Sequence, residues 1–112
     1  MKTLAFIFLL LLDVSGCDCK VTCVMGVNNR HKNPVEVIVD NSKLGVVPEN
    51  NVATFEVEGI PDNGGSSYNN DRIMVRVVFR DITTGKTTRT RNVELIENQV
   101  IYTDVEDHHF LP

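Results

Sequence analysis

Apolar and polar residues alternate with a period of two along most of this chain. Val35, Val37 and Val39 occupy every second position, and residues 53–58 and 73–80 continue the same alternation. Successive side chains of a β-strand point to opposite faces, so the pattern predicts strands with one buried face. No stretch after the first sixteen residues repeats its apolar positions at helical spacing over three turns. We therefore expect an all-β domain.

Turn-forming residues separate the predicted strands. Residues 40–43 (Asp-Asn-Ser-Lys) predict a tight reversal, residues 83–86 predict a hairpin with Gly85 in the left-handed conformation, and Glu97-Asn98 is expected to close the last hairpin. About seven short strands at this spacing favour a single antiparallel β-sandwich, either immunoglobulin-like or transthyretin-like. Its two sheets would bury the alternating valines between them.

The beginning of the chain does not follow this pattern. Lys2 precedes an unbroken apolar run over residues 4–12, and the small residues Ser15 and Gly16 follow it. Nine helical residues at ~1.5 Å each would cross about half of a ~30 Å bilayer core, but they have the length of a signal-peptide core. A buried helix of a cytosolic protein would need a polar face, which the run lacks. We expect residues 1–16 to be a cleaved signal peptide of an exported protein.

The cleavage site resembles a known motif. Val14-Ser15-Gly16-Cys17 is similar to the lipobox of bacterial lipoproteins, in which small residues precede an obligatory cysteine. The resemblance covers the first seventeen residues and implies that a diacylglycerol is attached to the Cys17 thiol before the leader is cut. Two or three acyl chains on Cys17 would hold the protein at the cell membrane. An ordinary signal peptidase could also cut here and leave the domain freely secreted.

These assignments divide the chain into four parts, and they determine what the other two cysteines can do. We expect a signal peptide at 1–16, a lipid-anchor tether at 17–20, a β-sandwich domain at 21–106 and a flexible tail at 107–112. On one strand, Cys19 and Cys23 would lie ~13 Å apart, beyond the ~7 Å limit for a disulfide. They could pair only if the segment before residue 21 turns back. Otherwise Cys23 is a small buried hydrophobe and Cys19 belongs to the tether.

A second resemblance concerns the domain itself. Residues 37–45 (Val-Ile-Val-Asp-Asn-Ser-Lys-Leu-Gly) resemble the hairpin of small surface β-domains of the PEGA or transthyretin-like kind, with Asn41 where glycine is usual. Residues 53–57 and 83–87 continue the likeness. The resemblance implies an extracellular interaction or spacer module and no catalytic residues.

The chain offers little for catalysis. Its histidines are His31, in a polar turn, and His108 and His109, in the last five residues, where chains usually fray. None is expected in a preorganised site beside a nucleophile. His108 and His109 could hold a divalent metal together with Glu106 and Asp107, but a solvated tail is the simpler interpretation. We expect no enzyme activity, no metal site and no cofactor.

Candidate binding residues lie in two places. The predicted hairpin around residue 85 is basic, and Arg76, Arg80 and Arg89 could dock an acidic partner or lipid head groups. The alternative is an outer sheet face balanced by carboxylates. The long polar loop 62–71 carries Tyr68, an amphipathic contact residue, although it could equally be a surface loop without a role. The formal charge of −4 argues against nucleic acid as a partner.

The strand register near this hairpin is open. Pairing Arg80 with Arg89 would set like charges opposite one another, which is unfavourable. A bulge at Gly85 would instead place Thr88 opposite Arg80, and it would bring Arg89 and Arg91 beside buried apolar residues.

The sequence therefore predicts a membrane-anchored lipoprotein whose small extracytoplasmic β-domain binds a partner or serves as structure. The alternative is a freely secreted β-domain that acts as an inhibitor or interaction factor. A third hypothesis is a small hydrolase or metal-binding protein that uses the histidines.

Overall fold

The computed structural model describes residues 20–61 and 71–111. The signal peptide, Cys17, Cys19 and Tyr68 lie outside these residues, so the predictions made for them stay predictions. Within the described part of the chain, no helix is both long enough and apolar enough to cross a membrane.

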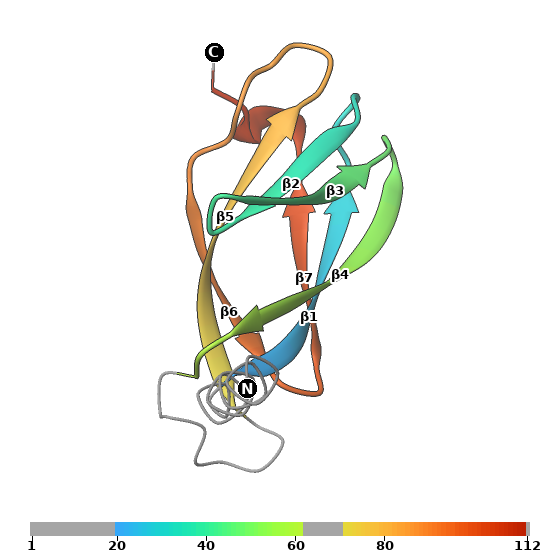
Figure 1. The fold of residues 1–112 in the computed structure, drawn as a ribbon. Helices are drawn as coiled ribbons and strands as arrows, with labels where there is room; N and C mark the ends of the chain where they lie inside the picture. The colour runs from blue at the N-terminus through green and yellow to red at the C-terminus, as the bar shows by residue number, and fades with distance from the viewer. Residues whose placement is uncertain (1–19, 62–70, 112) are drawn as a thin grey trace, which may run out of the picture.

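The described residues form seven strands in two sheets packed face to face, which confirms the all-β sandwich (Figure 1). One sheet has the strand order β4-β1-β7, and the other has the order β3-β2-β5-β6. A short 3-10 helix, η1, follows the last strand. The elements are β1 (Val21–Asn29), β2 (Val35–Val39), β3 (Ser42–Val47), β4 (Asn51–Gly59), β5 (Arg72–Asp81), β6 (Arg91–Ile96), β7 (Val100–Val105) and η1 (Asp107–His109).

The apolar positions that alternate along the sequence are the buried positions of the strands, most clearly in β2 and β5. Inward-facing residues of both sheets form one core, in which Phe79 and Met25 are the largest fully buried side chains. Cys23 is 1% exposed, as expected for a small buried hydrophobe. Burial raises the pKa of its thiol, and the carboxylates of Glu97 and Asp71 raise it further. Cys23 is therefore a protonated packing residue at neutral pH.

The tight reversal expected after β2 is present. Asp40 and Asn41 both have positive φ, 48° and 68°, as a two-residue hairpin turn requires. The turn is also fixed to β5, because the Asp40 amide donates to the Arg76 carbonyl and Asp40 Oδ1 accepts from the Arg76 amide, each at 2.9 Å. Gly85 also adopts the predicted left-handed conformation, with φ 76°.

The prediction that Glu97-Asn98 closes a hairpin is wrong. Asn98 does make a turn, with φ 65°, but β6 pairs with β5 while β7 pairs with β1 in the other sheet. The turn therefore carries the chain from one sheet to the other. The β1–β7 pair is parallel, whereas all other strand pairs of the described sheets are antiparallel. A local turn signal does not specify which sheet receives the next strand, so the sequence pattern did not distinguish the two cases.

Gly26 lies in the middle of this parallel pair, where an aromatic ring covers it. It pairs with Tyr102, and a Cβ atom at Gly26 would lie 2.4 Å from Cδ1 of that ring. Gly26 is buried although it faces outward, because the Tyr102 ring occupies the space that a Cβ atom would take.

We expect the substitution Gly26→Ala to lower the free energy of unfolding by about 1 kcal/mol, because the new methyl group displaces the Tyr102 ring. Urea denaturation followed by circular dichroism measures the change. In a Tyr102→Ala background the same substitution should be neutral or stabilising, since no ring remains to be displaced. An equal loss in both backgrounds would show that the ring contact has no part in the effect.

Candidate functional site

The residues after β7 are attached to the sandwich. The Leu111 amide donates to the Thr87 carbonyl at 3.1 Å, and Phe110 forms an isolated β-bridge with Thr88. Asp107 accepts a hydrogen bond from the Lys32 amide at 3.1 Å. The structure therefore differs from the flexible tail expected at 107–112, because contacts to distant parts of the chain hold residues 107–111.

His31 is the centre of this attachment. It was expected in a polar turn, and it is only 3% exposed. Its Nε2 lies 2.6 Å from Asp81 Oδ2, and its Nδ1 lies 2.5 Å from Asp107 Oδ1. The ring also stacks on Phe110, with 4.2 Å between centroids. This network was not predicted from the sequence, because these partners come from β5, η1 and the residue after η1, far away in the sequence.

Asp81 is the buried carboxylate of the network and is 2% exposed. Burial alone would raise its pKa, but the side chains of Asn33 and His31 and the amides of Thr84 and Thr83 donate hydrogen bonds to it. Together these donors hold the pKa of Asp81 well below its usual range. Both carboxylates accept hydrogen bonds when ionised, and each ring nitrogen of His31 faces one of them.

The network of His31, Asp81 and Asp107 was tested as a candidate catalytic site. A hollow of about 130 Å³ adjoins it, and Thr84 contributes a hydroxyl to the lining. Both ring nitrogens of His31 already contact carboxylates, and Thr84 Oγ1 accepts from the Lys86 amide at 3.3 Å. Among the described residues, the network thus leaves no free imidazole nitrogen to activate this hydroxyl, so we interpret it as structural.

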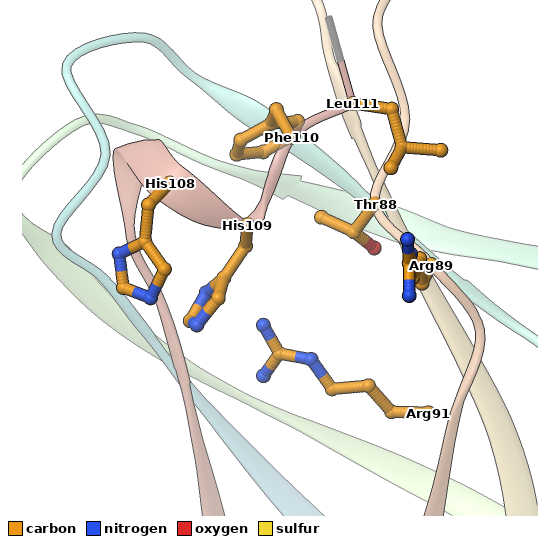
Figure 2. Close-up of a pocket in the computed structure, with 7 residues that line it drawn as sticks. All are labelled: Thr88, Arg89, Arg91, His108, His109, Phe110 and Leu111. Atoms are coloured by element: carbon orange, nitrogen blue, oxygen red, sulfur yellow. The ribbon is translucent and has the colours of Figure 1, made fainter.

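A larger pocket of about 330 Å³ lies on the other side of the same C-terminal segment (Figure 2). The segment between β5 and β6 contributes one wall, and η1 with the residues after it contributes the other. Figure 2 shows the guanidinium group of Arg91 extending from the first residue of β6 towards His109. The lining residues are Thr88, Arg89, Arg91, His108, His109, Phe110 and Leu111.

Arg91 forms the floor of this pocket. Its Nη1 donates to the Asp104 carbonyl at 2.8 Å, and its guanidinium carbon lies 5.5 Å from the centre of the Phe79 ring. Its Nη2 is buried and finds no hydrogen-bond partner among the described residues. Burial lowers the pKa of Arg91, although a guanidinium group stays charged at neutral pH.

The hydrogen bonds of His109 determine what its ring presents to the pocket. Its Nδ1 accepts from the Glu106 amide at 3.0 Å, so in the neutral ring Nε2 carries the proton. Burial lowers the pKa of His109, and the neighbouring charges of Arg91 and His108 lower it further. The neutral ring is therefore the form at neutral pH, and it offers an N–H donor.

The same hydrogen bond bears on metal binding. Ligand atoms of Glu106, His108 and His109 lie within 4.8 Å of one another, as a metal site would require. A metal ligand needs a lone pair, but one nitrogen of His109 accepts the Glu106 amide and the other is protonated. Arg91 also places a fixed positive charge beside the group. The donor set does not fit a divalent cation, and Asp107, the fourth candidate, contacts His31 instead.

The candidate binding residues chosen from the sequence do not form one site among the described residues. Arg89 lines the pocket of Figure 2, whereas Arg76 lines a different hollow on the outer face of the four-stranded sheet. Arg80 pairs with Glu36 across the sheet, with 3.5 Å between Nε and Oε1. Tyr68 lies outside the described residues.

The strand register around Gly85 differs from both alternatives considered from the sequence, which placed Arg89 or Thr88 opposite Arg80. Thr87 faces Arg80, so no like charges are opposed there. Arg91 does lie beside a buried apolar residue, Val77, as the bulged alternative implied.

Arg91 was not among the candidate binding residues, although one of the two possible registers placed it beside buried apolar residues. It is in phase with Val93 and Leu95, which marks an arginine on the inward face of a strand. His108 and His109 were considered as metal ligands, as residues of a small hydrolase or as part of a solvated tail. Comparison with known proteins found no matching family model, no matching curated protein and no matching solved structure.

Proposed function

We propose that this protein is an exported lipoprotein, whose β-sandwich is a binding module held at a membrane by lipid on Cys17. The observation that carries the proposal is the tetrapeptide Val14-Ser15-Gly16-Cys17 directly after the apolar run at 4–12. A cleaved leader of this length delivers a protein across a membrane, and acyl chains on Cys17 retain it there.

The position of the pocket supports a binding role. β1 follows the proposed tether directly and runs from one end of the sandwich towards η1 at the other end (Figure 1). Nine residues at ~3.3 Å each separate the two ends by about 30 Å. A domain anchored just before β1 would therefore hold the pocket of Figure 2 away from the membrane, in the aqueous space, where a soluble partner reaches it.

The anchor is tested by replacing the acylated cysteine. We expect the wild-type protein in the membrane fraction, and mass spectrometry should find its mature N-terminus at Cys17 with added acyl mass. The Cys17→Ala variant should lose the acyl mass and leave the membrane fraction when the leader is removed. Cys19→Ala is the matched control, and it should behave like the wild type.

Two outcomes would contradict the anchor. A wild-type N-terminus at any residue other than Cys17, or an unmodified Cys17, would exclude lipidation. Recovery of the wild-type protein from the culture medium would instead support the freely secreted alternative.

A further inference from the structure

Four of the residues that line the pocket of Figure 2 can donate hydrogen bonds. Arg89 and Arg91 carry positive charge, His109 presents Nε2–H, and the Thr88 hydroxyl oxygen accepts the Phe79 amide at 3.1 Å, which leaves its hydrogen free to donate. None of the described residues that line the pocket is acidic. The pocket therefore suits a group that only accepts hydrogen bonds and carries negative charge.

Two carboxylates near the pocket do not change this conclusion. Asp104 accepts from the Asn28 side chain at 3.2 Å, and it contacts Arg91 through its backbone carbonyl rather than its carboxylate. Glu106 precedes η1 and lies beside His108 and His109, but it is not among the lining residues. Neither carboxylate neutralises Arg91 by a hydrogen bond that would take up Nη2.

The strongest evidence for a ligand is an unpartnered hydrogen-bond donor of Arg91. A buried donor without a partner is rare in folded proteins, and it costs most when the donor belongs to a charged group. Nη2 of Arg91 is such a donor, and the guanidinium group points into the pocket (Figure 2). Because neighbouring atoms cover Nη2, a small rotation of the guanidinium group would bring it to an oxygen of a bound anion.

We propose that this pocket binds an oxyanion, a carboxylate or phosphate group carried by a molecule in the aqueous space. Arg91 and His109 bind it from the floor, and Arg89 and Thr88 bind it from the wall. The volume of about 330 Å³ accommodates such a group, and Leu111, which is 40% exposed, offers apolar contact to the carbon part of the ligand. The inference deepens the binding role proposed above and does not depend on the lipid anchor.

The test is a titration of the ¹⁵N-labelled mature protein in uncharged detergent, followed by NMR at constant ionic strength. Sodium phosphate and sodium acetate are the two probes, with sodium chloride as the reference. We expect saturable shifts of the Thr88, Arg89 and Phe110 amides with a dissociation constant of about 10 mM or lower. Saturation by phosphate alone identifies a phosphate ligand, and saturation by acetate alone identifies a carboxylate.

Variants connect the signal to the pocket. Arg91→Gln should weaken binding at least about tenfold, and Arg89→Gln, which changes an exposed side chain, should weaken it by about threefold or more if the fold is intact. Arg72→Gln is the matched control, because it removes the same charge at the other end of the sheet, where Arg72 pairs with Glu94. Its affinity should equal that of the wild type.

Two results would overturn the inference. The first is the absence of saturable shifts at the pocket with either anion. The second is a loss of affinity in Arg72→Gln as large as in Arg89→Gln, which would show a general charge effect. The fractionation experiment is independent of both. A protein recovered from the medium that still binds an anion would refute the anchor and leave this site standing.

Discussion

The substitution His31→Leu is expected to lower the free energy of unfolding by about 3–5 kcal/mol, because it takes one partner from a buried charged carboxylate. Asp81, which is 2% exposed, would keep only the side chain of Asn33 and the amides of Thr83 and Thr84 as donors. The substitution also releases Asp107, whose Oδ1 lies 2.5 Å from the ring. Urea denaturation followed by far-ultraviolet circular dichroism measures the change.

The exposed His108 supplies the matched control. His108→Leu makes the same chemical change on the surface and should alter stability by no more than about 0.5 kcal/mol. Equal effects of the two substitutions would show that the His31 network does not hold the fold together.

The second large effect is the dependence of stability on pH. Hydrogen bonds lower the pKa of Asp81, so folding favours its ionised form. The resulting stabilisation is fully present above the unfolded pKa of ~3.9, and it is lost as the pH falls through that value and below it. Each unit of lowered pKa corresponds to about 1.4 kcal/mol, so we expect a loss of more than this amount between about pH 5 and pH 2.

The variant Asp81→Asn isolates this contribution. It should be less stable than the wild type at pH 7, and the difference in unfolding free energy should shrink as the pH falls. Glu56→Gln, which removes an exposed carboxylate from the outer face of β4, is the matched control for the loss of a carboxylate. A stability difference for Asp81→Asn that stayed constant down to about pH 2 would contradict the assignment of Asp81 as the acid-sensitive group.

The elements that could be predicted are those fixed by local chemistry. The alternation in β5 determines which residues face the core, and Asp40-Asn41 accommodates positive φ wherever the strands lie. The partner sheet of β7 depends on its pairing with β1, which is separated from it by more than seventy residues. Nothing near Asn98 encodes that choice.

The candidate site was predictable only in part, for the same reason. Arg89 was identified because it belongs to a basic stretch of sequence. The role of His31 depends on carboxylates 50 and 76 positions away, and nothing around His31 identifies them. Arg91 was within reach, since an arginine in phase with Val93 and Leu95 indicates a charge at the edge of the core.

The attachment of η1 to the sandwich has a consequence for evolution of the pocket. Asp107 and Phe110 contact His31, while His108 and His109, between them in the chain, line the pocket. Substitutions at His31 or Asp81 would therefore loosen one wall without touching a ligand, and they would weaken affinity by making that wall less preorganised. Affinity for the proposed anion would then change from inside the fold, while the side chains that line the pocket stay the same.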